Sequence, residues 1–155
     1  DLQYFFTALK ALYQKYDSLE DIFVKYQTAE DLQTAIHHFK KEFMAFGCPK
    51  HTQKHISDPL KNSAAKRLNM MLRWFVRQDK NEVDFGIWKT LSPALLSCPL
   101  DVHTARVARK LELLKRKQND AKAVKELDKN LRKLDSSDPV KYDFALFGLG
   151  VYEGF

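Results

Sequence analysis

The chain has 155 residues, of which 45% are hydrophobic and 30% are charged. This length and composition fit one compact domain with its own core and are short for two domains. No apolar run approaches the roughly 18 residues that a membrane span requires, and no secretory leader is apparent. We therefore expect a soluble cytoplasmic protein without a membrane partner. Only Cys48 and Cys98 occur, which excludes a disulfide framework and indicates reduced thiols.

The formal net charge of +6 is concentrated in the middle of the chain. Residues 40–89 contain 11 Lys and Arg against 5 Asp and Glu, and residues 103–133 contain 11 against 4, whereas both ends of the chain are acidic. A basic face of this kind suggests a polyanionic partner, most often nucleic acid. For the lysine-rich run 110–133 taken alone, a solvated helix surface is the favoured interpretation.

The first half of the chain shows apolar residues at three-to-four-residue spacing and few turn signals, which predicts an all-helical domain. A first helix is expected over residues 2–16, and Ser18-x-x-Asp21 is typical of the start of a second. Thr28-x-x-Asp31 is expected to cap a third helix that ends at Gly47. The amphipathic pattern begins directly after Asp1, without a methionine, so we expect N-terminal elements of the protein to be missing.

The second half begins with a long polar connection over residues 48–63. Further helices are then expected over residues 62–78, from Ser92-Pro93 to Cys98-Pro99, from Asp101 to Lys115, over 120–134, and from Asp138-Pro139 to the glycines at 148–150. The segment between Gln78 and Pro99 should fold back on the domain with Phe85, Ile87 and Trp88 packed against it.

Lys66 and Asp101 are the most informative pair of residues, because each is expected at the start of a helix. The partial positive charge of a helix N-terminus disfavours an ammonium, so the neutral, nucleophilic amine of Lys66 is more available there. The same partial charge keeps Asp101 ionised and oriented. If the fold brings them together, they form a nucleophile and a stabilising anion. Taken singly, Lys66 could simply extend into solvent and Asp101 could be only a cap.

Other candidate sites carry less information. Cys48, His51, His55 and Cys98 are acceptable zinc ligands in type, but the spacing and the lysine-rich surroundings argue against zinc, and we expect no metal. His103 fits a packing or capping role and could also donate a hydrogen bond near the site. Trp74 and Trp88 are either core residues or platforms for a stacked base.

The segment PLDVHTARVARKLELL resembles the aspartate-bearing segment of the helix-hairpin-helix DNA glycosylase superfamily, and DPLKNSAAKRLNMMLRW resembles its hairpin and lysine segment. The separation of 35 positions between Lys66 and Asp101 is closer to that of the archaeal 8-oxoguanine glycosylase branch than to that of endonuclease-III-like members. Lys61-Asn62-Ser63 replaces the usual hairpin glycines, and no four-cysteine motif is present, so no iron–sulfur cluster or other cofactor is expected. The stretch from HISDPLKNSAAKRLN to DFALFGLGV is also very similar to a bacterial family of unknown function.

The resemblance implies a monomeric DNA repair glycosylase with lyase activity that excises an oxidised base from double-stranded DNA. Lys66 would form a Schiff base and Asp101 would stabilise the cationic transition state. Phosphates would be held by main-chain N–H groups near Lys61–Ser63 and by the residues Lys50, Lys54, Lys61, Asn62, Ser63 and Arg67. The base pocket would use Trp74, Trp88 and His103. A nucleic-acid-binding module without the chemistry, or a domain that binds an acidic protein, remains open as an alternative.

Overall fold

In the computed structural model, residues 1–80 and 82–155 are described, and within these ranges the chain forms seven α-helices and four short 3-10 helices with no named strand. This confirms the all-α prediction. In chain order the elements are α1 (Leu2–Lys15), α2 (Leu19–Tyr26), α3 (Gln33–Met44), η1 (Thr52–His55), η2 (Pro59–Lys61), α4 (Lys66–Val76), η3 (Pro93–Leu95), α5 (Val102–Lys110), α6 (Ala121–Leu134), η4 (Pro139–Tyr142) and α7 (Asp143–Val151).

Short polar residues begin the helices where the sequence indicated. Ser18 and Asp21 form the reciprocal capping box of α2, and the Asp101 carboxylate accepts the N–H groups of His103 and Thr104 at the start of α5. Asp120 caps α6 in the same way, by accepting the Ala123 N–H. Each of these contacts satisfies backbone donors that a helix start leaves unpaired.

Several boundaries differ from the prediction, among them those of α3 and α5. Thr28 accepts the N–H groups of Glu30 and Asp31 in a turn, and it is Asp31 that accepts the Gln33 N–H in the first turn of α3, so Thr28 does not cap that helix. Helix α3 ends at Met44, short of Gly47. Helix α5 ends at Lys110 instead of residue 115, and the chain then turns inward to bury Leu114.

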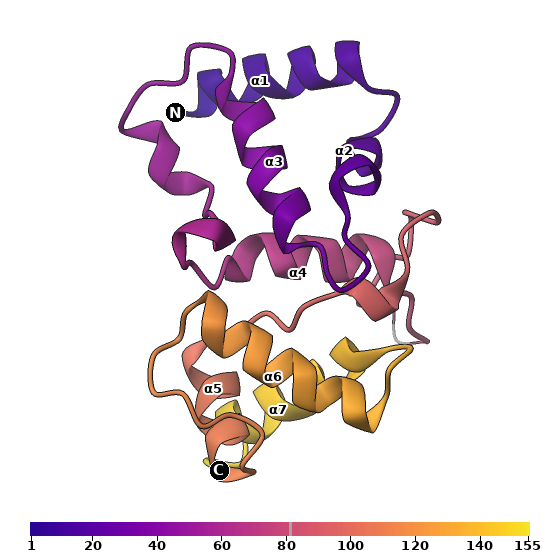
Figure 1. Ribbon diagram of the computed structural model, residues 1–155, viewed down its shortest axis with the longest axis vertical. Coiled ribbons are helices and arrows are strands. Elements are labelled where there is room, and N and C mark those ends of the chain that lie inside the picture. The colour runs from indigo at the N-terminus through magenta and orange to yellow at the C-terminus, as the bar shows by residue number, and fades with distance from the viewer. Residues whose placement is uncertain (81) are drawn as a thin grey trace.

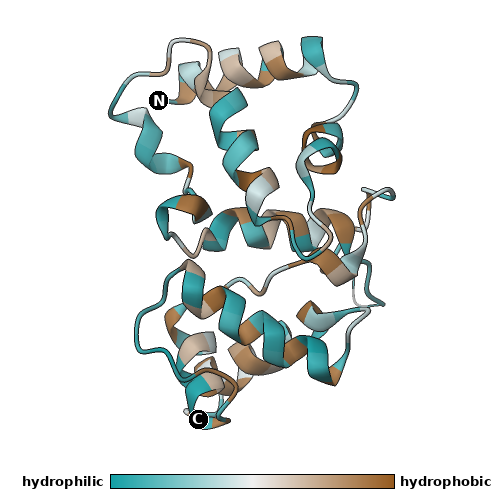
Figure 2. Cartoon of the chain, viewed as in Figure 1, coloured by the Kyte–Doolittle hydropathy of each residue, from teal (hydrophilic) through white to brown (hydrophobic). Residues whose placement is uncertain are grey.

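Buried side chains form two clusters, the first mostly from residues 8–96 and including Val140, and the second from residues 98–146. The first lies among α1, α2, α3, α4 and the segment around Trp88, and the second lies among α5, α6 and α7. Figure 1 shows α4 across the middle of the molecule, with α1–α3 above it and α5–α7 below it. Figure 2 shows that the visible face of α6 is largely hydrophilic while α7 is largely hydrophobic, and Phe144, Phe147 and Val151 of α7 are exposed.

The segment after α4 folds back onto that helix, as predicted. The Trp74 carbonyl accepts the N–H groups of Phe85 and Gly86, and the Phe75 carbonyl accepts that of Trp88. Trp88 packs in the first cluster, but Phe85 and Ile87 are 56% and 59% exposed, so the prediction that they are packed is wrong. Their direction follows from strand-like alternation, in which Asp84, Gly86 and Trp88 are buried and Phe85 and Ile87 are exposed.

Candidate active site

The hairpin over residues 58–66 positions the first candidate residue. Asp58 accepts the Leu60 N–H through its side chain and the N–H groups of Lys61 and Ser63 through its carbonyl. Asn62 and Ala65 both adopt the left-handed conformation, with φ of 64° and 44°. The turn at Ala65 delays α4, so that Lys66 is its first residue, whereas the sequence predicted a start at residues 62–63.

Lys66 and Asp101 are in direct contact. The Lys66 Nζ lies 3.2 Å from the Asp101 Oδ2, although 35 residues separate them in the chain. The lysine side chain is 43% exposed and the aspartate 10%, so the pair lies at the surface with the carboxylate on the protein side. The starts of α4 and α5 therefore meet, which is the geometry that both proposed roles require.

Asp101 is held ionised by its neighbours. Burial raises its pKa, but hydrogen bonds from the Thr104 N–H, from Lys66 and from the His103 N–H outweigh that effect and keep the pKa below its ordinary value. The two carboxylate oxygens are divided between partners: Oδ1 accepts the two N–H groups of α5, and Oδ2 accepts Lys66. A fixed anion with a low pKa suits stabilisation of positive charge better than it suits proton abstraction.

The first turn of α5 also carries two buried polar atoms without partners in the described part of the chain. They are the His103 Nδ1 and the Thr104 Oγ1. The His103 ring meets Phe147 of α7 edge-on, and a Cβ on Gly150 would lie 3.0 Å from the His103 Cβ, so α7 packs closely against this turn. Unpaired buried polar groups are uncommon, and they mark this turn as a place for a bound polar molecule or water.

The residues predicted to contact phosphates lie in the connection before α4 and in the first turn of that helix. Lys50, Lys54, Lys61, Asn62 and Arg67 are exposed, and Ser63 is half-buried. The main-chain part of that prediction is wrong, because the N–H groups of Lys61, Asn62 and Ser63 are already donated to the carbonyls of Asp58 and Pro59. The hairpin can offer a phosphate its side chains, and in particular Lys61, but not these N–H groups.

The two tryptophans lie away from the Lys66 amine. Trp88 is 7% exposed and its ring packs against Phe23 and Phe75, so it lies in the core, which is one of the two roles left open by the sequence. Trp74 is exposed, but it is eight residues from Lys66 on α4, which is about 12 Å along the helix axis. Of the three predicted pocket residues, only His103 lies beside Asp101.

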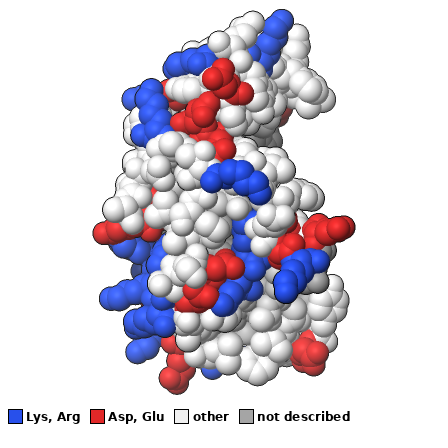
Figure 3. Space-filling model, turned by 90° about the vertical axis from the view of Figure 1, so that its right-hand side faces the viewer, with Lys and Arg blue, Asp and Glu red and all other residues white. Residues whose placement is uncertain are grey.

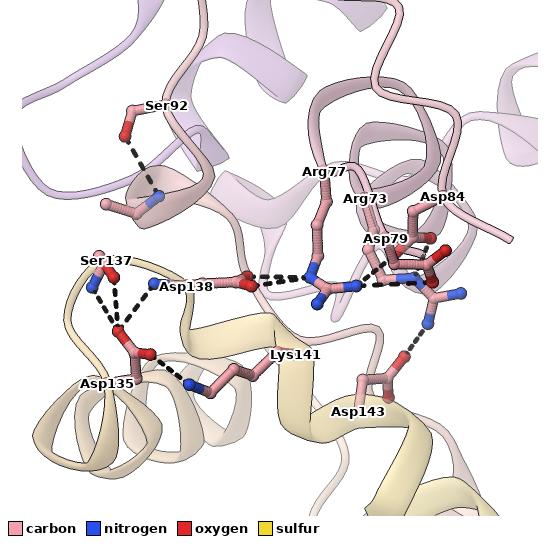
Figure 4. Close-up of polar contacts among 11 residues, drawn as sticks. Arg73, Arg77, Asp79, Asp84, Ser92, Asp135, Ser137, Asp138, Lys141 and Asp143 are labelled. Atoms are coloured by element: carbon pink, nitrogen blue, oxygen red, sulfur yellow. Dashed lines mark hydrogen bonds and ion pairs between the residues drawn. The ribbon is translucent and has the colours of Figure 1, made fainter. Parts of the chain in front are cut away.

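A buried ion network around Arg73 and Arg77 was not predicted from the sequence. Arg73 donates to Asp84 at 3.1 Å and also to Asp143 of α7. Arg77 donates to Asp84 at 2.8 Å and to Asp138 at 2.9 Å. Figure 4 shows both arginines reaching from α4 into this set of carboxylates. Arginines on the buried side of an amphipathic helix were the only available signal.

Two hollows lie along α6. A groove of about 830 Å³ runs between the loop at residues 28–34 and α6, bordered by Glu30, Asp31, Lys122, Lys125 and the buried Asp128. A smaller hollow of about 450 Å³ adjoins it along α6. Neither of these two hollows is lined by Lys66 or Asp101.

The four residues considered as zinc ligands do not come together. His51 and His55 each place Nε2 2.9 Å from the Asp1 carboxylate, whereas Cys98 is buried in the second cluster and donates to Asp143. Within residues 1–80 and 82–155, no group of three or more His, Cys, Asp or Glu is arranged to hold a metal ion.

One comparison with known proteins is informative. A family model described as a protein of unknown function, DUF2400, matches residues 1–152. The chain belongs to the DUF2400 family. Neither the curated proteins nor the solved structures gave a significant match. Family membership agrees with the predicted similarity to a family of unknown function, and the resemblance to DNA glycosylases stays a prediction from the two segments that hold Lys66 and Asp101.

A further observation concerns membranes. Across residues 1–80 and 82–155, every helix is either too short or too polar to cross a lipid bilayer.

Proposed function

We propose that this DUF2400 protein is a DNA glycosylase with associated lyase activity, acting on an oxidised base. The observation that supports the proposal is the 3.2 Å contact between the Lys66 Nζ and the Asp101 Oδ2, made where two helices begin. Displacement at a sugar carbon through a Schiff base requires an accessible amine as the nucleophile and a fixed anion that stabilises the developing positive charge. Lys66 and Asp101 provide these two groups in the proposal.

In the proposed reaction, the deprotonated Lys66 amine attacks C1′ of the damaged nucleotide. A C–N bond to lysine forms as the bond from C1′ to the base breaks, and the base leaves with a proton. Asp101 stabilises the positive charge that develops on the sugar. Opening of the sugar ring gives the protonated Schiff base, loss of a proton from C2′ expels the 3′-phosphate, and water then releases Lys66.

The phosphate contacts in this proposal come from side chains. Lys61 and Arg67 are exposed on either side of Lys66, and Lys50 and Lys54 lie on the preceding connection. Because phosphate contacts position the nucleic acid without reading its sequence, these residues would set the register of the duplex on the protein. The unpaired His103 Nδ1 and Thr104 Oγ1 would face a polar group of the substrate or a water beside Asp101.

The test is covalent trapping with borohydride on duplex DNA that contains an abasic site or an oxidised purine. We predict that wild-type protein is trapped and that Lys66→Gln is not, because glutamine cannot form a Schiff base. Lys61→Gln is the matched control: it removes one exposed charge from the same hairpin and should retain trapping. Trapping by Lys66→Gln would remove this residue from the mechanism, and absence of trapping by the wild type would refute the lyase.

The alternative function is a nucleic-acid-binding module that lacks the chemistry. It is favoured by the exposed basic side chains of residues 50–67. In that case the wild type binds duplex DNA with an affinity that falls steeply with salt, and it is not trapped.

A further inference from the structure

Helix α6 carries four exposed lysines in one line. Lys122, Lys125, Lys129 and Lys133 are all exposed, and the intervals of three, four and four residues place them on the same side of the helix. The opposite side, with Ala123, Val124, Leu127 and Leu131, is buried in the second cluster. At 1.5 Å per residue the line, here called the α6 lysine row, extends about 16 Å.

The acidic residues of α6 do not neutralise this row, because each is turned to another partner. Asp120 pairs with Arg116 and caps the helix, and Glu126 accepts the N–H groups of Lys115 and Arg116. Asp128 is buried and accepts the Cys98 N–H. The only carboxylate paired with the row in the described part of the chain is Glu30, which lies 3.8 Å from the Lys125 Nζ. Both side chains are 78% exposed, so the interaction is weak and screened by salt.

The other basic residue of α6 is engaged elsewhere. Arg132 donates to the carbonyls of Ala94 and Leu96, so it serves the fold. Figure 3 shows Lys and Arg side chains gathered at the lower left of the molecule, in the half that contains α5, α6 and α7. The row is therefore a strip of positive charge on one helix, with the exposed Lys125–Glu30 contact as its ion pair in the described part of the chain.

The row is continuous with the hairpin that leads to Lys66. Asn62 donates to Asp120 at 3.1 Å, its carbonyl accepts the Ala121 N–H, and Ser63 pairs with Asp120 as an isolated bridge. The start of α6 is thus fixed to the hairpin, and the row runs away from it. The residue after Lys61 is therefore in contact with the residues that begin α6.

From these observations we propose that the α6 lysine row binds the sugar-phosphate backbone of duplex DNA and extends the contact made at the hairpin. About 16 Å of lysines matches roughly five nucleotide steps of one strand at 3.4 Å per step. The proposal rests on the proposed function only in taking duplex DNA as the ligand, and it does not depend on the chemistry of Lys66.

The test compares two variants of equal charge. One replaces the row with glutamine, and the control replaces four exposed lysines outside the row and outside the proposed site, Lys10, Lys41, Lys80 and Lys89. Glutamine and lysine have similar helix propensity, so both variants should fold, which circular dichroism checks. The affinity for an undamaged 20-base-pair duplex is measured over a range of salt concentrations.

If all four lysines contact phosphates, the slope of log affinity against log salt should be smaller by about 3 to 4 in the row variant, with an affinity loss on the order of 10²-fold or more at 0.1 M salt. The control variant should keep the wild-type slope. Equal slopes for the two variants would overturn the proposal, as would a wild type that does not bind duplex. Equal binding of polyglutamate and DNA would also overturn it, in favour of an acidic protein partner.

Trapping separates this inference from the proposed enzyme activity. At low salt the row variant should still be trapped by borohydride, because Lys66 and Asp101 are intact. A wild type that binds DNA through the row but is never trapped would refute the glycosylase and leave the row proposal standing.

Discussion

At the scale of single residues, the two carboxylate oxygens of Asp101 bind different partners. Its Oδ1 caps α5 and its Oδ2 accepts the Lys66 amine. The capping duty needs only one oxygen, which asparagine also has, whereas the pairing with an ammonium needs the second oxygen and its charge. Substitution can therefore separate the structural role from the proposed chemical one.

We predict that Asp101→Asn changes the free energy of unfolding by less than about 1 kcal/mol, because asparagine caps a helix about as well as aspartate. Excision of an oxidised base should fall by on the order of 10²-fold, since a neutral amide stabilises the cationic transition state poorly. Single-turnover excision and urea denaturation measure the two effects. Asp101→Ala is the control and should lose both stability and activity. Wild-type excision by Asp101→Asn would reduce Asp101 to a cap.

Asp128 provides a residue-scale test that involves no ligand. Burial raises its pKa to about 6, against the lowering effect of the hydrogen bonds from the Cys98 N–H and from Ser97. Because the folded pKa lies above the ordinary value of 3.8, the folded state takes up this proton before the unfolded state does. The contribution of Asp128 to stability therefore grows as pH falls from 7 towards 4.

We predict that wild type gains about 1 kcal/mol of stability relative to Asp128→Asn between pH 7 and pH 5. Urea denaturation of both proteins at several pH values gives the difference, and effects of other titrating groups cancel in it. Identical pH profiles would mean that Asp128 ionises normally and is better solvated than its burial indicates.

At the scale of elements, the sequence predicts what is determined locally. Helix starts at Ser18, Asp101 and Asp120 were predictable because an N-cap is a contact within three residues of the chain. The start of α4 could not be predicted, because Ala65 adopts a left-handed conformation that alanine rarely takes. No glycine lies next to Ala65 to indicate such a turn in the sequence.

The candidate site likewise has features that were predictable from local sequence and features that depend on tertiary packing. Residue type and helix position were enough to select Lys66 and Asp101, but their 3.2 Å contact depends on how α4 and α5 pack, which periodicity does not encode. The pairing of Arg73 with Asp143 across 70 residues was out of reach for the same reason. Trp88 was ambiguous because an aromatic residue serves a core and a base platform equally well.

At the scale of the whole molecule, the two hydrophobic clusters are linked by charges as well as by chain connections. Arg73 of α4 reaches Asp84 in the segment after that helix and Asp143 at the start of α7, and all three side chains are buried. Its guanidinium also lies 4.5 Å from the centre of the Phe144 ring. The relative placement of α4 and α7 therefore depends on one arginine, and α7 in turn supports the turn that holds Asp101 and His103.

We predict that Arg73→Met destabilises the protein by about 3 to 5 kcal/mol at pH 7, because buried carboxylates lose their counter-charge while methionine keeps the apolar volume. Burial already raises the pKa of Asp143 despite Arg73. Without the arginine that pKa rises further, so protonation relieves the strain and the deficit should shrink as pH falls from 7 to 5. Urea denaturation at both pH values measures it.

Two further variants make this test specific. Arg67→Met removes an exposed arginine from the same helix and should change stability by less than about 0.5 kcal/mol. Adding Asp143→Asn to Arg73→Met removes one of the stranded charges, so the double variant should be more stable than Arg73→Met alone and less dependent on pH. If Arg73→Met is as stable as Arg67→Met, the network does not hold the two clusters together, and apolar contacts along α4 alone must place α7 beneath the Lys66–Asp101 pair.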